Sequence, residues 1–266
     1  MTPPPSDKPP ILEVRHLRKS FAERAVLADV DFDVPTGAVV SILGRSGTGK
    51  SVLLKCIIGL LETDGGHVLY KGESLKLPEV RSQLRQSSSY VFQQNALFDS
   101  ATVFENVLLP LRARGKGTRK EWEVKVRKVL ARMELEESSG LYPAELSGGM
   151  QKRLAVARAL VTEPELVFFD EPTAGLDPLR RNAVFSMVCE LQRERGFTAI
   201  LVTHDVQEAL VVSSRILWLD AGRVRFNGEA ASFEASQEPE LREFRDNIEA
   251  LRATLEKSRS RHSPTL

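Results

Sequence analysis

Residues 44–51 read GRSGTGKS, a glycine-rich run that ends in a lysine and a serine. The run matches the phosphate-loop pattern, in which glycines let backbone N–H groups close around the β- and γ-phosphates of a nucleotide. The Lys50 ammonium adds a positive charge, and the Ser51 hydroxyl can bind Mg²⁺. A chance glycine-rich turn is the alternative interpretation. The pattern predicts a nucleotide site that is formed by Gly44, Arg45, Ser46, Gly47, Thr48, Gly49, Lys50, Ser51 and Val52.

Two acidic residues, Asp170 and Glu171, follow the apolar run LVFF. Such a run is typical of a buried strand, and α/β sheets bind ligands at the carboxyl ends of their strands. We expect Asp170 to hold Mg²⁺, usually through water, and Glu171 to orient and polarise an attacking water as general base. Acids in this place can instead cap a helix. The phosphate loop in the same chain favours the catalytic interpretation.

A histidine and a glutamine also follow apolar segments. His204 comes after TAILVT, at the sheet edge predicted for Lys50 and Asp170, and we expect it to contact the γ-phosphate rather than serve structure alone. Gln93 lies in YVFQQNALF, and its amide can contact both a metal and an attacking water. The predicted catalytic residues are Glu171, His204 and Gln93, and the predicted metal-binding residues are Ser51, Gln93 and Asp170.

A second glycine motif, ELSGGMQKR, occupies residues 145–153. Small residues at the start of a predicted helix leave backbone N–H groups without partners, and such groups can bind an anion. The chain thus carries two candidate phosphate-binding motifs, far apart in the sequence.

The elements that must position these residues follow from the pattern of apolar residues. VLADVDFDV, at 26–34, alternates apolar residues with aspartates, which predicts a half-exposed, antiparallel strand. A strand buried on both faces is predicted at 38–44, and further strands at 166–170, 198–204 and 215–220. A buried helix is predicted at 50–61 and a charged helical region at 116–162. The order is α/β core, helical insert, α/β core.

The composition limits the class of protein. The chain has 266 residues, 42% hydrophobic and 27% charged, with a net charge of +1, which fits a globular protein and gives no basic surface for nucleic acid. The two cysteines, Cys56 and Cys189, fit no disulfide or metal pattern and indicate a reducing cytosol. The densest apolar stretch, SVLLKCIIGLL, is too short to span a membrane. The proline-rich residues 1–10 are expected to be disordered and lack the apolar run of a signal peptide.

The tail after Gly228 has a helical pattern of its own. Its apolar residues repeat at intervals of three and four and are Leu241, Phe244, Ile248, Leu251 and Leu255. We expect residues 229–266 to form an amphipathic helix and a frayed end. The helix either packs on its own domain or contacts a second copy or a partner.

These motifs, in this order, resemble the ATP-binding subunit of an ABC transporter over residues 11–228. The resemblance implies a P-loop NTPase α/β core with an antiparallel β subdomain and an inserted α-helical subdomain at about 94–162 that carries the LSGGM signature. It also implies ATP, Mg²⁺, ATP hydrolysis and a head-to-tail dimer. Ser147, Gly148 and Gly149 would then bind the γ-phosphate of ATP held by the other copy, together with Asp177 of the DEPTAGLD run. Phe21 occupies the place of a tyrosine that stacks on adenine.

The segment NALFDSATVFENVLLPL, at 95–111, is similar to the ATPases of Mce-type lipid transport systems, which include the maintenance-of-lipid-asymmetry systems. This resemblance implies phospholipid transport through a separate integral membrane permease and a Mce-domain lipid-binding protein. It places the chain peripherally, on the cytoplasmic face of the inner (plasma) membrane. The alternatives are the ATPase of a small-solute importer and a permease-free ABC ATPase that acts on ribosomes or DNA. A small-molecule kinase is disfavoured because it would have no use for LSGGM.

Overall fold

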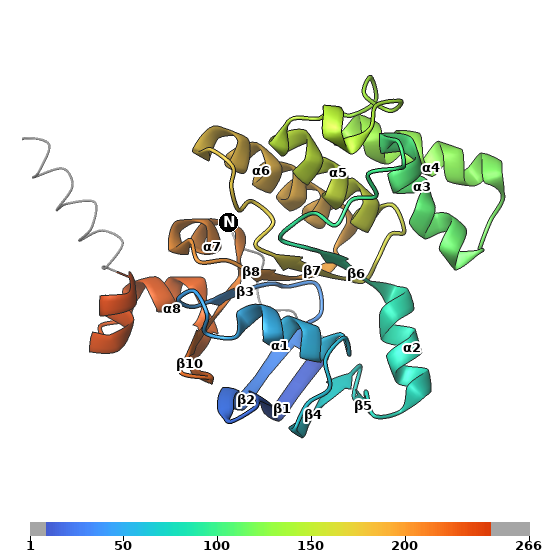
Figure 1. Ribbon diagram of the computed structural model, residues 1–266. Coiled ribbons are helices and arrows are strands. Elements are labelled where there is room, and N and C mark those ends of the chain that lie inside the picture. The colour runs from blue at the N-terminus through green and yellow to red at the C-terminus, as the bar shows by residue number, and fades with distance from the viewer. Residues whose placement is uncertain (1–8, 246–266) are drawn as a thin grey trace, which may run out of the picture.

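The computed structural model describes residues 9–245, which form one ten-stranded sheet with helices on both faces (Figure 1). Across the sheet the strand order is β5-β4-β1-β2-β10-β9-β3-β8-β7-β6. The strands are β1 Pro10–Phe21, β2 Arg24–Pro35, β3 Val39–Leu43, β4 Gly65–Tyr70, β5 Glu73–Ser74, β6 Ser88–Val91, β7 Leu166–Asp170, β8 Thr198–Val202, β9 Arg215–Asp220 and β10 Arg223–Glu229. The helices are α1 Lys50–Ile57, α2 Pro78–Ser87, α3 Val103–Arg114, α4 Arg119–Arg132, α5 Gly148–Leu160, α6 Pro178–Arg195, α7 Val206–Val212 and α8 Ala230–Ala235.

The parallel part of the sheet is β9, β3, β8, β7 and β6. Strand β7 is buried along its whole length, and its side chains alternate between two cores. Leu166 and Phe168 pack in the core that contains α1, whereas Val167 and Phe169 pack in the core that contains α5 and α6. Helices on both faces explain why this strand is apolar throughout, as the sequence predicted.

The antiparallel part of the sheet is β1, β2, β4 and β5. Val30, Phe32 and Val34 of β2 are buried and share a core with α1, so the period-two prediction for this strand is confirmed. The same core contains residues of β3, β7 and β8, because the sheet curls around α1. Figure 1 shows α1 between the two parts of the sheet.

Helix α1 ends earlier than the sequence predicted. The apolar run continues to residue 61, but the helix ends at Ile57, and Leu60 is 54% exposed. Gly59 adopts a left-handed conformation with φ of 71°, which a glycine accepts without strain. Leu60 N–H then bonds back to the Lys55 carbonyl at 2.8 Å, a typical helix ending.

Helices α3, α4 and α5 occupy the region expected to be helical, above the parallel strands in Figure 1. Thr102 and Thr118 each start a helix with a capping box, so both helix starts are fixed locally. The limits of a separate subdomain stay a prediction. Strand β1 begins at Pro10, the last residue of the stretch expected to be disordered.

The start of the C-terminal tail packs on its own domain. Residues 239–245 are helical, and Leu241 and Phe244 are buried in a cluster with Phe233 and Trp218. The rings of Phe244 and Trp218 stack with centroids 5.3 Å apart. Ile248, Leu251 and Leu255, which continue the predicted stripe, lie outside the described residues. None of the helices within 9–245 is both long and apolar enough to span a membrane.

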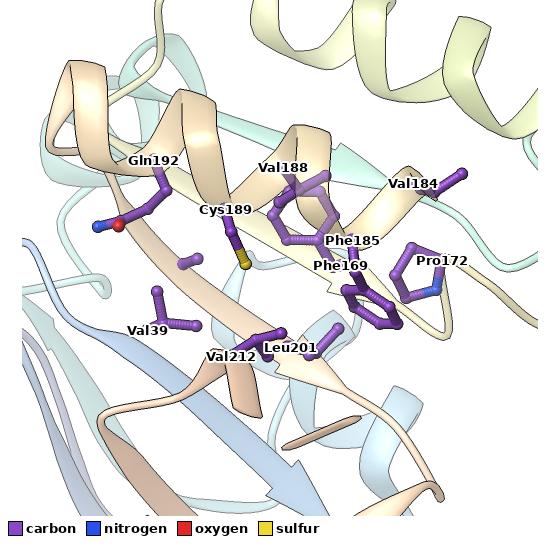
Figure 2. A pocket seen from close by; sticks show the side chains of 11 residues that line it. Val39, Phe169, Pro172, Val184, Phe185, Val188, Cys189, Gln192, Leu201 and Val212 are labelled. Carbon is purple, nitrogen blue, oxygen red and sulfur yellow. The ribbon is translucent and has the colours of Figure 1, made fainter. Parts of the chain in front are cut away.

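A small apolar cavity lies between α6 and the sheet (Figure 2). Phe185 and Cys189 of α6 line one wall, and Val39, Phe169 and Leu201 of the strands line another. Its volume is about 20 Å³. A space of this size holds about one water molecule and offers it no polar partners, so we interpret it as a packing gap.

Candidate nucleotide-hydrolysis site

The phosphate loop joins β3 to α1, and two of its glycines are required by geometry. A Cβ on Gly44 would lie 2.5 Å from the Leu219 carbonyl oxygen, and one on Gly49 would lie 2.7 Å from Val26 Cγ1. Gly49 also has φ of 98°. No side chain caps the start of α1, so its first N–H groups remain available to an anion.

Backbone carbonyls of the loop hold the Lys50 side chain in place. Its Nζ donates to the carbonyls of Gly44 at 2.8 Å and Arg45 at 2.9 Å, and the side chain is buried. Burial lowers the pKa of Lys50, and the negative charges of Glu171 and Asp170 oppose that shift. The ammonium therefore lies at the loop carbonyls and is attracted by the charges of two acids, in the loop that is predicted to bind phosphate.

Asp170 and Ser51 lie side by side at the end of β7 and the start of α1. Ser51 Oγ donates to Asp170 Oδ1 at 2.8 Å, and the Asp170 carboxylate is buried. Adjacent oxygen ligands in an octahedral Mg²⁺ shell are about 3 Å apart, given metal–oxygen distances of about 2.1 Å. The two oxygens would therefore fit neighbouring positions around Mg²⁺, and binding of the ion by Ser51 and Asp170 stays a prediction.

A third member of this group, Tyr90 of β6, was not predicted from the sequence. Its hydroxyl donates to Asp170 Oδ2 at 2.8 Å. Burial, together with the negative charge of Asp170, raises the pKa of Tyr90, so the phenol stays protonated and remains a donor. The hydroxyl thus fixes the carboxylate oxygen that Ser51 does not contact. A tyrosine three residues before Gln93, on the strand beside β7, is the signal that could have revealed it.

Glu171 lies between the two other predicted catalytic side chains. Gln93 Nε2 donates to Glu171 Oε2 at 3.3 Å, and His204 Nδ1 lies 3.5 Å from Glu171 Oε1. Glu171 has φ of 46°, and its N–H donates to the Val202 carbonyl at 2.9 Å. A positive φ in a non-glycine residue is strained and is common at functional sites. An amide and an imidazole on either side of a carboxylate can together bind and orient a water.

The alternative that the two acids serve only as helix caps fails. Helix α6 begins at Pro178, and its cap is Asp177, whose Oδ1 accepts from the Arg180 N–H at 3.0 Å. Asp170 and Glu171 bond instead to the groups described above. These contacts with Ser51, Tyr90, Gln93 and His204, and not the capping of a helix, account for the two acids at the end of β7.

A second group that was not predicted from the sequence anchors Asp205, the residue that follows His204. Arg181 of α6 bonds Asp205 Oδ2 at 2.9 Å and lies 3.1 Å from Glu208 Oε1. The Glu208 side chain is only 10% exposed, and burial raises its pKa. Asp205 caps α7 by accepting from the Glu208 N–H at 3.1 Å. The residue that follows His204 is thus fixed to both α6 and α7.

The remaining predicted residues lie apart from this group. Ser147 caps α5, where its Oγ accepts from the Met150 N–H at 3.4 Å, and Ser147, Gly148 and Asp177 are exposed. Within residues 9–245, no hydrogen bond or ion pair joins residues 147–149 to the phosphate loop. Phe21 is 46% exposed, with Lys19 Nζ 5.4 Å from its ring centroid. One chain therefore brings together the hydrolytic residues but not the two glycine motifs.

The fold and the site define the class of protein. A phosphate loop lies between a parallel strand and a helix, its serine contacts an acid at the end of another parallel strand, and a helical region is inserted between the two. This is the α/β architecture of a P-loop nucleotide hydrolase.

The comparisons with known proteins identify the family within that class. A family model described as "ABC transporter" matches residues 27–174, more than half of the chain. The chain belongs to the ABC transporter family. Proteins of this family with this cassette fold hydrolyse ATP, and the chain is an ATP-binding subunit of a membrane transporter.

Two curated relatives match more than four fifths of the chain. The glutamine transport ATP-binding protein GlnQ of Escherichia coli is 41% identical over 220 residues, 82% of this chain and 91% of the relative. The intermembrane phospholipid transport system ATP-binding protein MlaF of Escherichia coli is 34% identical over 241 residues, 90% of this chain and 89% of the relative.

A solved structure confirms the fold. The dimeric structure of MJ0796, a bacterial ABC transporter cassette, matches with a TM-score of 0.75 and 31% identity, over 82% of this chain and 98% of that one. A further structure of MJ0796 is described as a post-hydrolysis state bound to ADP and Pi, and it matches equally well, with a TM-score of 0.75. The sequence prediction of a mixed α/β ABC cassette is confirmed.

Proposed function

We propose that this subunit hydrolyses ATP to drive phospholipid transport through a separate integral membrane permease, as in Mce-type systems. MlaF supports this proposal, since its similarity extends over 90% of the chain, and so does the segment at 95–111. The proposal places the subunit on the cytoplasmic face of the inner membrane, with a Mce-domain lipid-binding protein as a further partner. The import of a small solute is the second candidate, and the higher identity to GlnQ favours it.

The proposed hydrolytic mechanism rests on the contacts of Glu171. Lys50 and the N–H groups of the loop bind the β- and γ-phosphates. Ser51 and Asp170 would hold Mg²⁺, which would neutralise phosphate charge, and Gln93 is proposed as a further ligand of the ion. Glu171 accepts a proton from the attacking water. Gln93 and His204 orient that water, because both side chains contact the Glu171 carboxylate.

The proposed active unit is a dimer of this chain. Ser147 and Gly148 are exposed at the start of α5, where the helix dipole presents about half a positive charge. In a head-to-tail dimer, Ser147, Gly148, Gly149 and Asp177 would meet the γ-phosphate of ATP bound to the other copy, while Phe21 stacks on the adenine of its own ATP. The dimeric state of MJ0796 supports this arrangement.

Two experiments test these proposals separately. For hydrolysis, Glu171→Gln should keep ATP bound and stall turnover, because an amide cannot accept the proton; turnover equal to wild type would assign the base to another residue. For the substrate, the tagged chain is isolated from detergent-solubilised membranes, and its proteins and lipids are identified by mass spectrometry. A permease with a Mce-domain protein and phospholipid is expected. A permease with a solute-binding protein would replace the lipid proposal by solute import.

A further inference from the structure

Lys152 is a buried lysine to which the hydrolytic mechanism assigns no role. It lies in α5, one turn after the exposed Ser147 and Gly148, and only 5% of its surface is exposed. Burying an ammonium away from water is unfavourable unless it is paired or hydrogen-bonded. A buried lysine in this motif therefore requires an explanation from its partners.

The partner of Lys152 is the loop that contains Gln93. Its Nζ donates to the backbone carbonyl of Gln93 at 2.5 Å, and this is its one hydrogen-bond acceptor among residues 9–245. The side chain of the same glutamine donates to Glu171 Oε2 at 3.3 Å. A continuous path therefore runs from α5 through Lys152 and Gln93 to the carboxylate beside the phosphate loop.

The charge of Lys152 also acts on this site. Burial lowers the pKa of Lys152, and the negative charge of Glu171 opposes the shift. The two groups form no ion pair within 4.0 Å, so the attraction acts through space at low dielectric, where it is stronger than in water.

We propose that Lys152 is a positioning residue for ATP hydrolysis: its ammonium fixes the backbone of Gln93, whose side chain contacts the Glu171 carboxylate. It ties the helix that begins at the LSGGM motif to the residues that orient the attacking water. A movement of α5 when the motif binds phosphate would therefore move Gln93. This inference rests on the roles of Gln93 and Glu171 that are proposed above.

Arg158 provides a matched control, because it anchors the same loop from the same helix. Its guanidinium donates to the carbonyls of Ala96 at 2.7 Å and Asn95 at 2.9 Å, and it is partly buried. Burial lowers the pKa of Arg158, with no contribution from Glu171. Arg158→Met thus removes a loop anchor and its packing but leaves the path to Glu171 intact.

The test compares Lys152→Met, Lys152→Arg, Arg158→Met and Glu171→Gln in the full chain, with kcat and KM measured for MgATP. Lys152→Met should lower kcat about tenfold, equivalent to about 1.4 kcal/mol, with KM within about twofold of wild type, because the phosphate loop is untouched. Lys152→Arg keeps the charge and the donors and should restore most of the loss. Arg158→Met should lower the melting temperature without this selective loss of kcat.

Three results would overturn the role of Lys152. These are an unchanged kcat in Lys152→Met, an equal fall in Arg158→Met, and a rise in KM that accounts for the whole effect. If Lys152→Met does not fold, Lys152→Gln replaces it: its amide keeps a donor for the Gln93 carbonyl but has no charge, so kcat should still fall at constant KM, and a normal kcat rejects the proposal. Normal turnover in Glu171→Gln would instead reject Glu171 as the base. The effect of Lys152→Met on kcat would then be judged without reference to Glu171.

Discussion

Removing one oxygen atom from Tyr90 tests whether Asp170 is a magnesium ligand that its neighbours hold in place. The hydroxyl is the only group that the structure assigns to Asp170 Oδ2 within residues 9–245, at 2.8 Å. Tyr90→Phe leaves the ring packed against Phe168, with centroids 6.2 Å apart, so the substitution removes little besides the hydrogen bond. A hydrogen bond to a charged group contributes about 1.5–3 kcal/mol, and groups that orient metal ligands commonly change metal affinity about 10–100-fold.

We therefore expect the free Mg²⁺ concentration for half-maximal ATPase activity to rise at least about tenfold in Tyr90→Phe. The assay is ATP turnover at saturating nucleotide over a series of free Mg²⁺ concentrations, with Mn²⁺ binding as a second measurement that needs no turnover. Tyr70→Phe is the matched control, because the Tyr70 hydroxyl contacts Ser87 Oγ at 2.7 Å and Glu165 Oε2 at 3.3 Å, away from Asp170. Both variants should melt at lower temperature, but only Tyr90→Phe should need more Mg²⁺. Equal Mg²⁺ requirements in the two variants would refute the reasoning.

Three other predictions address binding, the support of His204 and the tail. Lys50→Ala should lose most nucleotide binding, because Lys50 is the fixed charge at the phosphates; normal affinity in a titration with a fluorescent ATP analogue would contradict the assignment. Arg181→Met should lower kcat more than KM, because Asp205 loses its bond to α6 beside His204; a pure loss of thermal stability would leave Arg181 a structural role. Phe244→Ala should destabilise the fold by about 3 kcal/mol or more, since the ring is 7% exposed and stacked on Trp218; calorimetry measures this, and an unchanged melting temperature would argue against tail packing.

The sequence predicted the elements whose signal is local. GRSGTGKS predicts a phosphate loop because the glycines, the lysine and the serine that bind phosphate lie within eight consecutive residues. The alternation in β2 predicts a strand with one buried face, because successive side chains of a strand point to opposite faces. The apolar runs of β3, β7 and β8 predict strands that are buried on both faces. The sequence also indicated that Asp170, Glu171 and His204 share one sheet edge, since parallel strands carry their carboxyl ends to the same side.

Other elements gave a weaker signal. Helix α2 and strands β1, β4 and β5 were not predicted, because they are short or mixed in character and gain most of their stability from neighbours. The end of α1 at Ile57 depends on the left-handed conformation of Gly59, which an apolar run to residue 61 does not reveal. A local pattern overestimates the length of a helix when a turn ends the helix before the apolar run ends.

By itself, the sequence determined the chemistry of the site. Each reactive residue can be identified from its type and from its position after a predicted strand or at the start of a predicted helix. Only the tertiary structure decided which groups hold those residues: Tyr90 on Asp170, Lys152 on Gln93 and Arg181 on Asp205. These partners come from different strands and helices, separated by many residues along the chain. Their contacts exist only once the sheet order and the packing of α5 and α6 are fixed, and no local pattern of residues encodes that arrangement.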